Sequence, residues 1–120
     1  EAIQRANQKV AESSIVVILT PIYKASFTGI LKTYLDLLPQ KALEGKLLVP
    51  AAVGGSVAHL LAIEYSLKPI LSVLGATEIL NTVYIIDKQI EKLTANDGFR
   101  IAEEAEQRLT KELQKLKTRV

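Results

Sequence analysis

The fold of this chain is indicated by residues 14–38, which read SIVVILTPIYKASFTGILKTYLDLL. The first part, Ser14–Leu19, is an apolar and mostly β-branched run, which is typical of a buried strand in a parallel sheet. Pro21 and a turn of small residues follow, and the amphipathic segment from Thr28 to Leu38 is expected to be a helix. Ligands of open α/β sheets bind at the carboxyl ends of the strands, so the polar loop between this strand and helix is the first candidate for a functional site.

Strands and helices alternate along the rest of the chain. A second apolar run lies at residues 46–53 and contains Pro50. It is still expected to be a buried strand, because the residues on both sides of the proline are apolar. The alternation predicts a doubly wound α/β fold with a parallel sheet, present as its second half in one domain over residues 1–120. The remaining predicted segments are a helix over 2–12, a strand over 46–53, a helix over 57–74 that is kinked or split at Lys68 before Pro69, a strand over 79–86, a polar irregular segment over 87–96 and a helix over 98–118.

The last predicted helix carries an apolar stripe and a basic end. The stripe is formed by Phe99, Ile101, Ala105, Leu109, Leu113 and Leu116. The basic end, which is expected to be solvated and favourable to the helix dipole, consists of Lys111, Lys115, Lys117 and Arg119.

Composition excludes several classes of function. The 120 residues carry a net charge of +2 with dispersed basic residues, which is too mild to indicate a nucleic-acid partner. The chain has no Cys and one His, so disulfides are excluded and no metal site is expected. No apolar run reaches about 18 residues and no signal-peptide pattern opens the chain, so no membrane partner and a cytoplasmic location are expected. The chain opens with Glu1 and has no Met, and we expect that it does not begin at a translation start.

Two motifs carry a resemblance to a known family. Residues 21–32 read PIYKASFTGILK, residues 54–69 read GGSVAHLLAIEYSLKP, and LLP lies between them at 37–39. Together they resemble the NADPH-dependent FMN reductases, a flavodoxin-like family, and most closely the branch that serves alkanesulfonate monooxygenases. The resemblance covers residues 12–86.

The resemblance implies a flavodoxin-like fold, an activity and an assembly. Hydride would pass from NADPH to N5 of FMN, and reduced FMN would go to a flavin-dependent monooxygenase in organosulfonate use. Members of the family form homodimers or homotetramers through long helices near the flavin edge. They also begin with a strand and a Gly-Ser-rich phosphate loop, which this sequence lacks, so the domain is expected to be N-terminally incomplete. We therefore expect these residues alone neither to bind FMN tightly nor to remain monomeric.

The resemblance also implies which residues bind the cofactor, while no catalytic residue is expected because the chemistry belongs to the flavin ring. Backbone N–H groups of residues 22–24 would face the polar edge of the ring, and those of residues 54–56, at a helix N-terminus, would stabilise negative charge near N1 and O2. Glycine would let the backbone approach the ring closely. The implied cofactor-binding residues are Pro21, Ile22, Tyr23, Lys24, Gly54, Gly55, Ser56 and His59.

Simpler interpretations of these residues remain open. Pro21 and the Gly pair also fit ordinary turns, and Lys24 fits a solvated loop lysine as well as a phosphate contact. His59 could touch the ring or a nicotinamide, or pack at a subunit contact. Phe27 stands where relatives in this branch tend to carry Tyr, so packing is kept and a hydroxyl is not.

Two other functions remain open for the whole chain. One is a quinone or azo reductase that keeps its FMN bound, and the other is a non-catalytic flavodoxin-like fragment that acts only in assembly. A Ser-His hydrolase is disfavoured, because Ser56 and His59 lie one helical turn apart with no nucleophile elbow.

Overall fold

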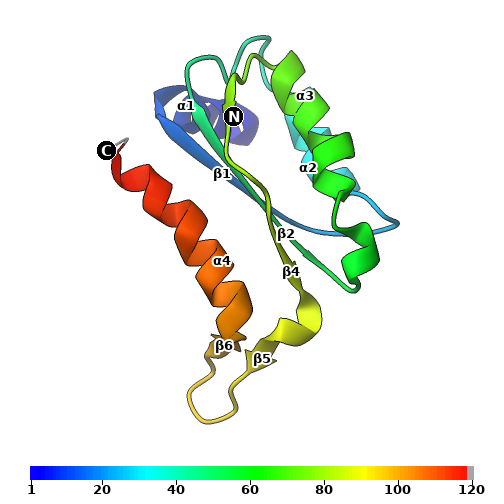
Figure 1. Cartoon of the computed structure of the whole chain (residues 1–120). Helices are drawn as coiled ribbons and strands as arrows, with labels where there is room; N and C mark the ends of the chain where they lie inside the picture. The colour runs from blue at the N-terminus through cyan, green and yellow to red at the C-terminus, as the bar shows by residue number, and fades with distance from the viewer. Residues whose placement is uncertain (119–120) are drawn as a thin grey trace.

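The computed structural model, in which residues 1–118 are described, is built on a parallel sheet (Figure 1). Strand β2 (Leu47–Gly54) lies at its centre. It pairs with β1 (Ile15–Pro21) on one side and with β3 (Glu78–Ile79) and β4 (Val83–Ile86) on the other, always in parallel. The parallel α/β sheet predicted from the apolar runs is therefore confirmed.

The third strand is interrupted, although it was predicted to be continuous over 79–86. The Leu80 N–H donates to the Leu48 carbonyl at 2.9 Å, so the backbone groups of Leu48 point toward β3 and β4. Every second residue of β2 counted from Leu48 points its N–H and C=O to the same side. Pro50 is two residues after Leu48, so it should donate on this side, but proline has no N–H. The gap between β3 and β4 lies opposite Pro50, because β3 pairs with β2 up to Leu48 and β4 pairs with it from Ala51. Proline in a central strand is thus accommodated by a break in its neighbour.

Helices cover the two faces of the sheet unequally (Figure 1). Helices α1 (Ala2–Glu12), α2 (Gly29–Asp36) and α3 (Lys68–Val73) lie on one face, and α4 (Glu103–Gln114) lies on the other. The first face holds the larger core, and the second packs Ala105 of α4 against β4. Prominent members of the larger core are Ile18, Leu35, Leu48, Ile63, Leu67 and Leu71.

The segment after β2 is not the single helix predicted over 57–74. It consists of a 3₁₀ turn, η1 (Val57–His59), a π-helical turn, η2 (Ile63–Leu67), and α3. Pro69 explains the irregularity, since it cannot donate to the carbonyl four residues earlier and a wider π turn relieves that mismatch. The change from η2 to α3 falls at Lys68, where the break was predicted.

The C-terminal part also differs from the prediction. Residues 87–96 are not irregular throughout, because they form a 3₁₀ turn, η3 (Asp87–Gln89), and a strand, β5 (Ile90–Lys92). Strand β6 (Phe99–Ile101) pairs with β5 in antiparallel register, so Phe99 and Ile101 belong to a hairpin and not to the helix stripe.

Helix α4 begins only at Glu103 and is followed by the 3₁₀ turn η4 (Lys115–Thr118). Its first turn carries Glu103, Glu104 and Glu106, whose charges favour a helix N-terminus. Arg119 of the predicted basic end lies outside the described residues.

Strand β1 forms an open edge in the described part of the chain, where it pairs only with β2. Helix α4 packs over β2 and β4, and the side chains of β1 on that face stay 60% exposed at Val17 and 69% exposed at Leu19. Among the described residues no helix has the length and apolar character needed to cross a membrane.

Candidate functional site

The loops that follow β1 and β2 lie side by side at the carboxyl edge of the sheet. Pro21 is in register with Val53, and the Ile22 N–H continues the ladder by donating to the Val53 carbonyl at 2.9 Å. Between the loops is an open hollow of about 490 Å³. It is lined by Ile22, Lys24, Ala25, Gly55, Ser56 and His59.

The loop after β1 is a tight, preformed turn. Tyr23 and Ser26 exchange two backbone hydrogen bonds of 2.9 and 3.1 Å across it. The two residues between them, Lys24 and Ala25, have φ values of 51° and 66°. Left-handed backbone costs an ordinary L residue about 1 kcal/mol or more, so the loop holds a conformation that its tip residues do not favour. The two hydrogen bonds between Tyr23 and Ser26 hold the tip in this conformation.

Thr20 closes the base of this loop. Its buried hydroxyl accepts a hydrogen bond from the Thr28 N–H at 3.3 Å and donates to the Pro21 carbonyl at 2.8 Å. Thr28 in turn caps α2, because its hydroxyl accepts from the Leu31 N–H at 3.1 Å. Thr20 was not among the residues predicted from the sequence, because a lone hydroxyl in an otherwise apolar strand belongs to no motif.

The two glycines of the β2 loop have different surroundings. A Cβ on Gly54 would overlap the Tyr84 hydroxyl, so its missing side chain serves internal packing. Internal packing thus accounts for glycine at position 54 without a ligand, and close approach of this residue to a flavin ring stays a prediction. A Cβ on Gly55 would meet no atom within 4 Å, and this glycine faces open space. Ser56 caps η1, because its hydroxyl accepts the Ala58 N–H at 3.0 Å.

The predicted amide donors divide into engaged and unengaged groups. The N–H groups of Ile22 and Tyr23 donate to Val53 and Ser26 carbonyls, so the prediction that they face a ring is wrong. By contrast, the amides of Lys24, Gly55 and Ser56 donate to no other residue in the described part of the chain. The helix dipole that was expected to stabilise negative charge at residues 54–56 is also smaller than predicted, because η1 has only three residues and is not part of a long helix.

The structure brings five of the eight predicted cofactor-binding residues around the hollow, and it adds Ala25. The other three do not line it. Pro21 is the last residue of β1, the Tyr23 side chain is 64% exposed, and Gly54 lies against Tyr84. Lys24 gives the hollow a positive charge and no carboxylate lines it, which suits an anionic or electron-rich ligand.

Other features of the described residues are less suited to a polar ligand. A groove of about 400 Å³ between α2 and α3 is lined mainly by apolar side chains. A smaller hollow of about 290 Å³ beside β1 is lined by apolar residues and Tyr34. No cluster of three or more potential metal ligands is present in residues 1–118. The hollow between the β1 and β2 loops lies at the carboxyl edge of the sheet, where ligands of open α/β sheets bind, and it is the candidate site for this reason.

The chain is similar to known FMN reductases. The family model for NADPH-dependent FMN reductases matches residues 1–91. An FMN reductase (NADPH) from Pseudomonas putida is 44% identical over 107 residues, which are 89% of this chain and 54% of that protein. An FMN reductase (NADPH) from Escherichia coli is 48% identical over 89 residues, which are 74% of this chain and 47% of that protein.

A solved structure shares the fold. The crystal structure of an NADH:FMN oxidoreductase in its apo form superimposes with a TM-score of 0.85 at 31% identity, covering 99% of this chain and 60% of that one. This similarity confirms the flavodoxin-like fold that the sequence motifs implied. The chain spans about half the length of the curated relatives it matches.

Proposed function

Because the chain belongs to the NADPH-dependent FMN reductase family, we propose that the protein containing it reduces FMN with NADPH, and that FMN binds at the hollow between the β1 and β2 loops. The observation that carries this proposal is the convergence of the two loops at the carboxyl edge of adjacent parallel strands. Ligands of open α/β sheets bind at this edge.

The residues around the hollow supply hydrogen-bond donors and a positive charge. The unengaged amides of Gly55 and Ser56 would donate to the polar edge of the flavin and favour its reduced, more negative form. Lys24 and its amide would contact polar oxygens from the opposite loop. His59 would border the ring or the nicotinamide from η1. The flavin supplies the hydride chemistry when bound, and these residues bind and orient it.

Other parts of the proposal concern partners. NADPH is the proposed donor because both curated relatives carry it in their names, whereas the solved structure is an NADH enzyme. The motifs over residues 21–32 and 54–69, with LLP at 37–39 between them, together support delivery of reduced FMN to a monooxygenase of organosulfonate utilisation. A cytoplasmic location belongs to the same proposal.

Self-association is proposed from exposed apolar side chains near the hollow. Leu61 and Tyr65, one helical turn apart after η1, are 56% and 75% exposed. An apolar helical surface of this kind is typical of contacts between subunits, so we propose a homodimer or homotetramer. Sedimentation of Tyr65→Lys beside the unmodified protein tests this surface, and an unchanged mass would exclude it.

The test of FMN binding is Gly55→Val in the complete protein that contains this chain. A Cβ at Gly55 has open space and an ordinary φ, so the fold should tolerate valine while the side chain enters the hollow. We expect FMN affinity, measured by quenching of flavin fluorescence, to fall at least tenfold, which corresponds to about 1.4 kcal/mol.

Gly29→Val is the matched control. A Cβ at Gly29 also meets no atom within 4 Å, but this residue starts α2 and does not line the hollow. Its FMN affinity should stay within about twofold of the unmodified protein. Unchanged affinity in Gly55→Val would remove FMN from this hollow.

A further inference from the structure

Tyr84 lies beneath the β2 loop and does not line the hollow. Its side chain, on β4, is only 2% exposed. The phenol donates a hydrogen bond to the Ser56 carbonyl at 2.6 Å. The same carbonyl accepts the His59 N–H at 3.2 Å, so the phenol reaches the residue that joins the loop to η1. The Tyr84 hydroxyl is thus bonded to the backbone next to Gly55, Ser56 and His59, which line the hollow.

The packing around this phenol leaves little freedom. Gly54 passes directly over the hydroxyl, where a Cβ would overlap it. Burial is the main reason why the pKa of the Tyr84 phenol is raised above its ordinary value of 10.0, and the nearby Asp87 carboxylate raises it further. At neutral pH the phenol therefore keeps its proton and donates a hydrogen bond.

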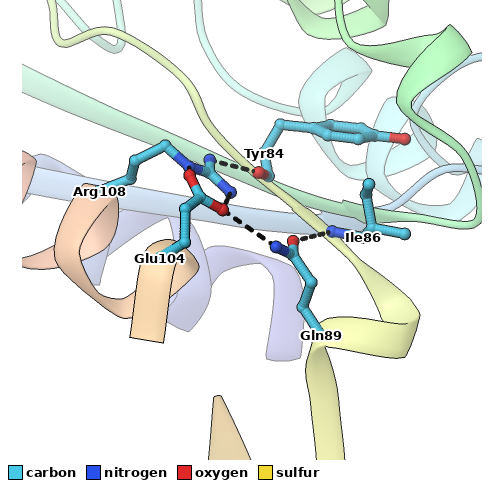
Figure 2. A network of polar contacts seen from close by, with 5 residues as sticks. All are labelled: Tyr84, Ile86, Gln89, Glu104 and Arg108. Atoms are coloured by element: carbon cyan, nitrogen blue, oxygen red, sulfur yellow. Dashed lines mark hydrogen bonds and ion pairs between the residues drawn. The ribbon is translucent and has the colours of Figure 1, made fainter. Parts of the chain in front are cut away.

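The backbone of Tyr84 is held from the opposite side (Figure 2). Arg108 of α4 donates to the Tyr84 carbonyl at 2.6 Å and also binds Glu104. Gln89 donates to Glu104 at 3.0 Å and accepts the Ile86 N–H at 3.0 Å. Figure 2 shows the ring of Tyr84 extending away from Arg108. The network therefore fixes β4 at Tyr84 and again at Ile86, while the phenol remains directed at the loop.

We infer that Tyr84 is a positioning residue for the hollow: its phenol holds the Gly55-Ser56 backbone and His59 where they meet FMN, without touching FMN itself. This inference rests on the proposed function only for the identity of the ligand. Arg108, Glu104 and Gln89 act behind it by fixing the strand that carries the phenol. No motif in the sequence marks Tyr84, which reads as one apolar member of a strand.

The test compares Tyr84→Phe with Tyr34→Phe in the complete protein. Tyr34 is a matched control because its partly buried phenol also makes one hydrogen bond, to Asn7 at 2.9 Å, away from the hollow. Both variants should melt at somewhat lower temperature. Only Tyr84→Phe should raise the dissociation constant and KM for FMN, by about two- to tenfold, the effect expected of one neutral hydrogen bond. Its kcat should change less than its KM.

A second measurement needs no ligand. Amide hydrogen exchange in the free protein should accelerate at Ala58 and His59 in Tyr84→Phe and not in Tyr34→Phe. FMN affinity equal to that of the unmodified protein, or an equal loss in both variants, would overturn the inference. If the unmodified protein does not bind FMN, the proposed function fails. Amide exchange then decides whether Tyr84 positions the loop. Unchanged exchange at Ala58 and His59 in Tyr84→Phe would reject this role.

Discussion

Two buried hydroxyls support the hollow from below at the scale of single residues. Thr20 joins the two ends of the β1 loop, and Tyr84 holds the β2 loop at Ser56. Each places a polar group inside an apolar strand environment, where a hydrogen bond is needed to offset the loss of water. These residues shape the site without lining it.

Replacing Thr20 by Val should loosen the β1 loop. Valine has nearly the same shape but removes both hydrogen bonds, leaving the Thr28 N–H and the Pro21 carbonyl without a partner. At about 0.5–1.5 kcal/mol for each bond, the free energy of unfolding should fall by about 1–3 kcal/mol. FMN affinity should fall several-fold. Urea unfolding and FMN titration measure the two effects.

Thr20→Ser is the control, since it keeps the hydroxyl. It should lose less stability than Thr20→Val and keep FMN affinity close to that of the unmodified protein. Equal FMN binding by Thr20→Val would show that the loop keeps its shape without this hydroxyl.

Site residues could be predicted from the sequence where they stand in loops with a motif. Lys24, Gly55, Ser56 and His59 were found in this way and do gather at one hollow. Thr20 could not be found, because a single hydroxyl in a strand has no periodic or motif signal. The internal engagement of the Ile22 amide depends on strand register, which the local sequence does not reveal, whereas that of the Tyr23 amide arises in the local turn with Ser26.

At the scale of elements, α4 is held by hydrogen bonds to β4 and η3, and an ion pair within the helix supports them. Glu104 binds Arg108 one turn later and accepts a hydrogen bond from Gln89 of η3. The hydrogen bond from Arg108 lowers the pKa of the Glu104 carboxyl below its ordinary value of 4.5, and the hydrogen bond from Gln89 adds a smaller effect in the same direction. Glu104 therefore connects α4 to η3, and it binds Arg108, which donates to the Tyr84 carbonyl of β4.

The lowered pKa of Glu104 predicts a pH dependence of stability. A carboxyl whose pKa is lower in the folded than in the unfolded state contributes stability above its unfolded pKa of about 4.5, and this is lost as pH falls through the folded pKa. Glu104→Gln should therefore be less stable than the unmodified protein near neutral pH, with the difference shrinking in acid.

Urea unfolding across this pH range is the measurement. Glu106→Gln, a neighbouring glutamate in the same first turn of α4, is the control and should show a smaller pH-dependent difference. A Glu104→Gln difference that stays constant with pH would contradict the assigned pKa direction.

Elements with long periodic patterns were predictable, and short ones were not. The apolar runs predicted β1 and β2, and the helical spacing predicted α1 and α2. The β5–β6 hairpin was missed because its strands have three residues each, and Phe99 and Ile101 fit a helical spacing as well as an alternating one. The break opposite Pro50 arises from strand pairing, which a single strand does not disclose.

At the scale of the whole molecule, the open edge of β1 is the least protected surface of the sheet. Unpaired backbone groups on an apolar edge strand favour association. The 120-residue chain alone should therefore sediment as more than a monomer. Leu19→Lys, which places a charge beside this edge, should shift it toward the monomer. Val73→Lys is the control, because Val73 is 83% exposed on α3 and lies away from β1. A monomeric unmodified chain would contradict this prediction.

Amide chemical shifts recorded during an FMN titration of the complete protein report whether FMN binds between the β1 and β2 loops. The largest changes should occur at Lys24, Gly55 and Ser56, whose N–H groups have no partner in the described part of the chain. Changes confined to the groove between α2 and α3, or no changes at saturating FMN, would contradict the account.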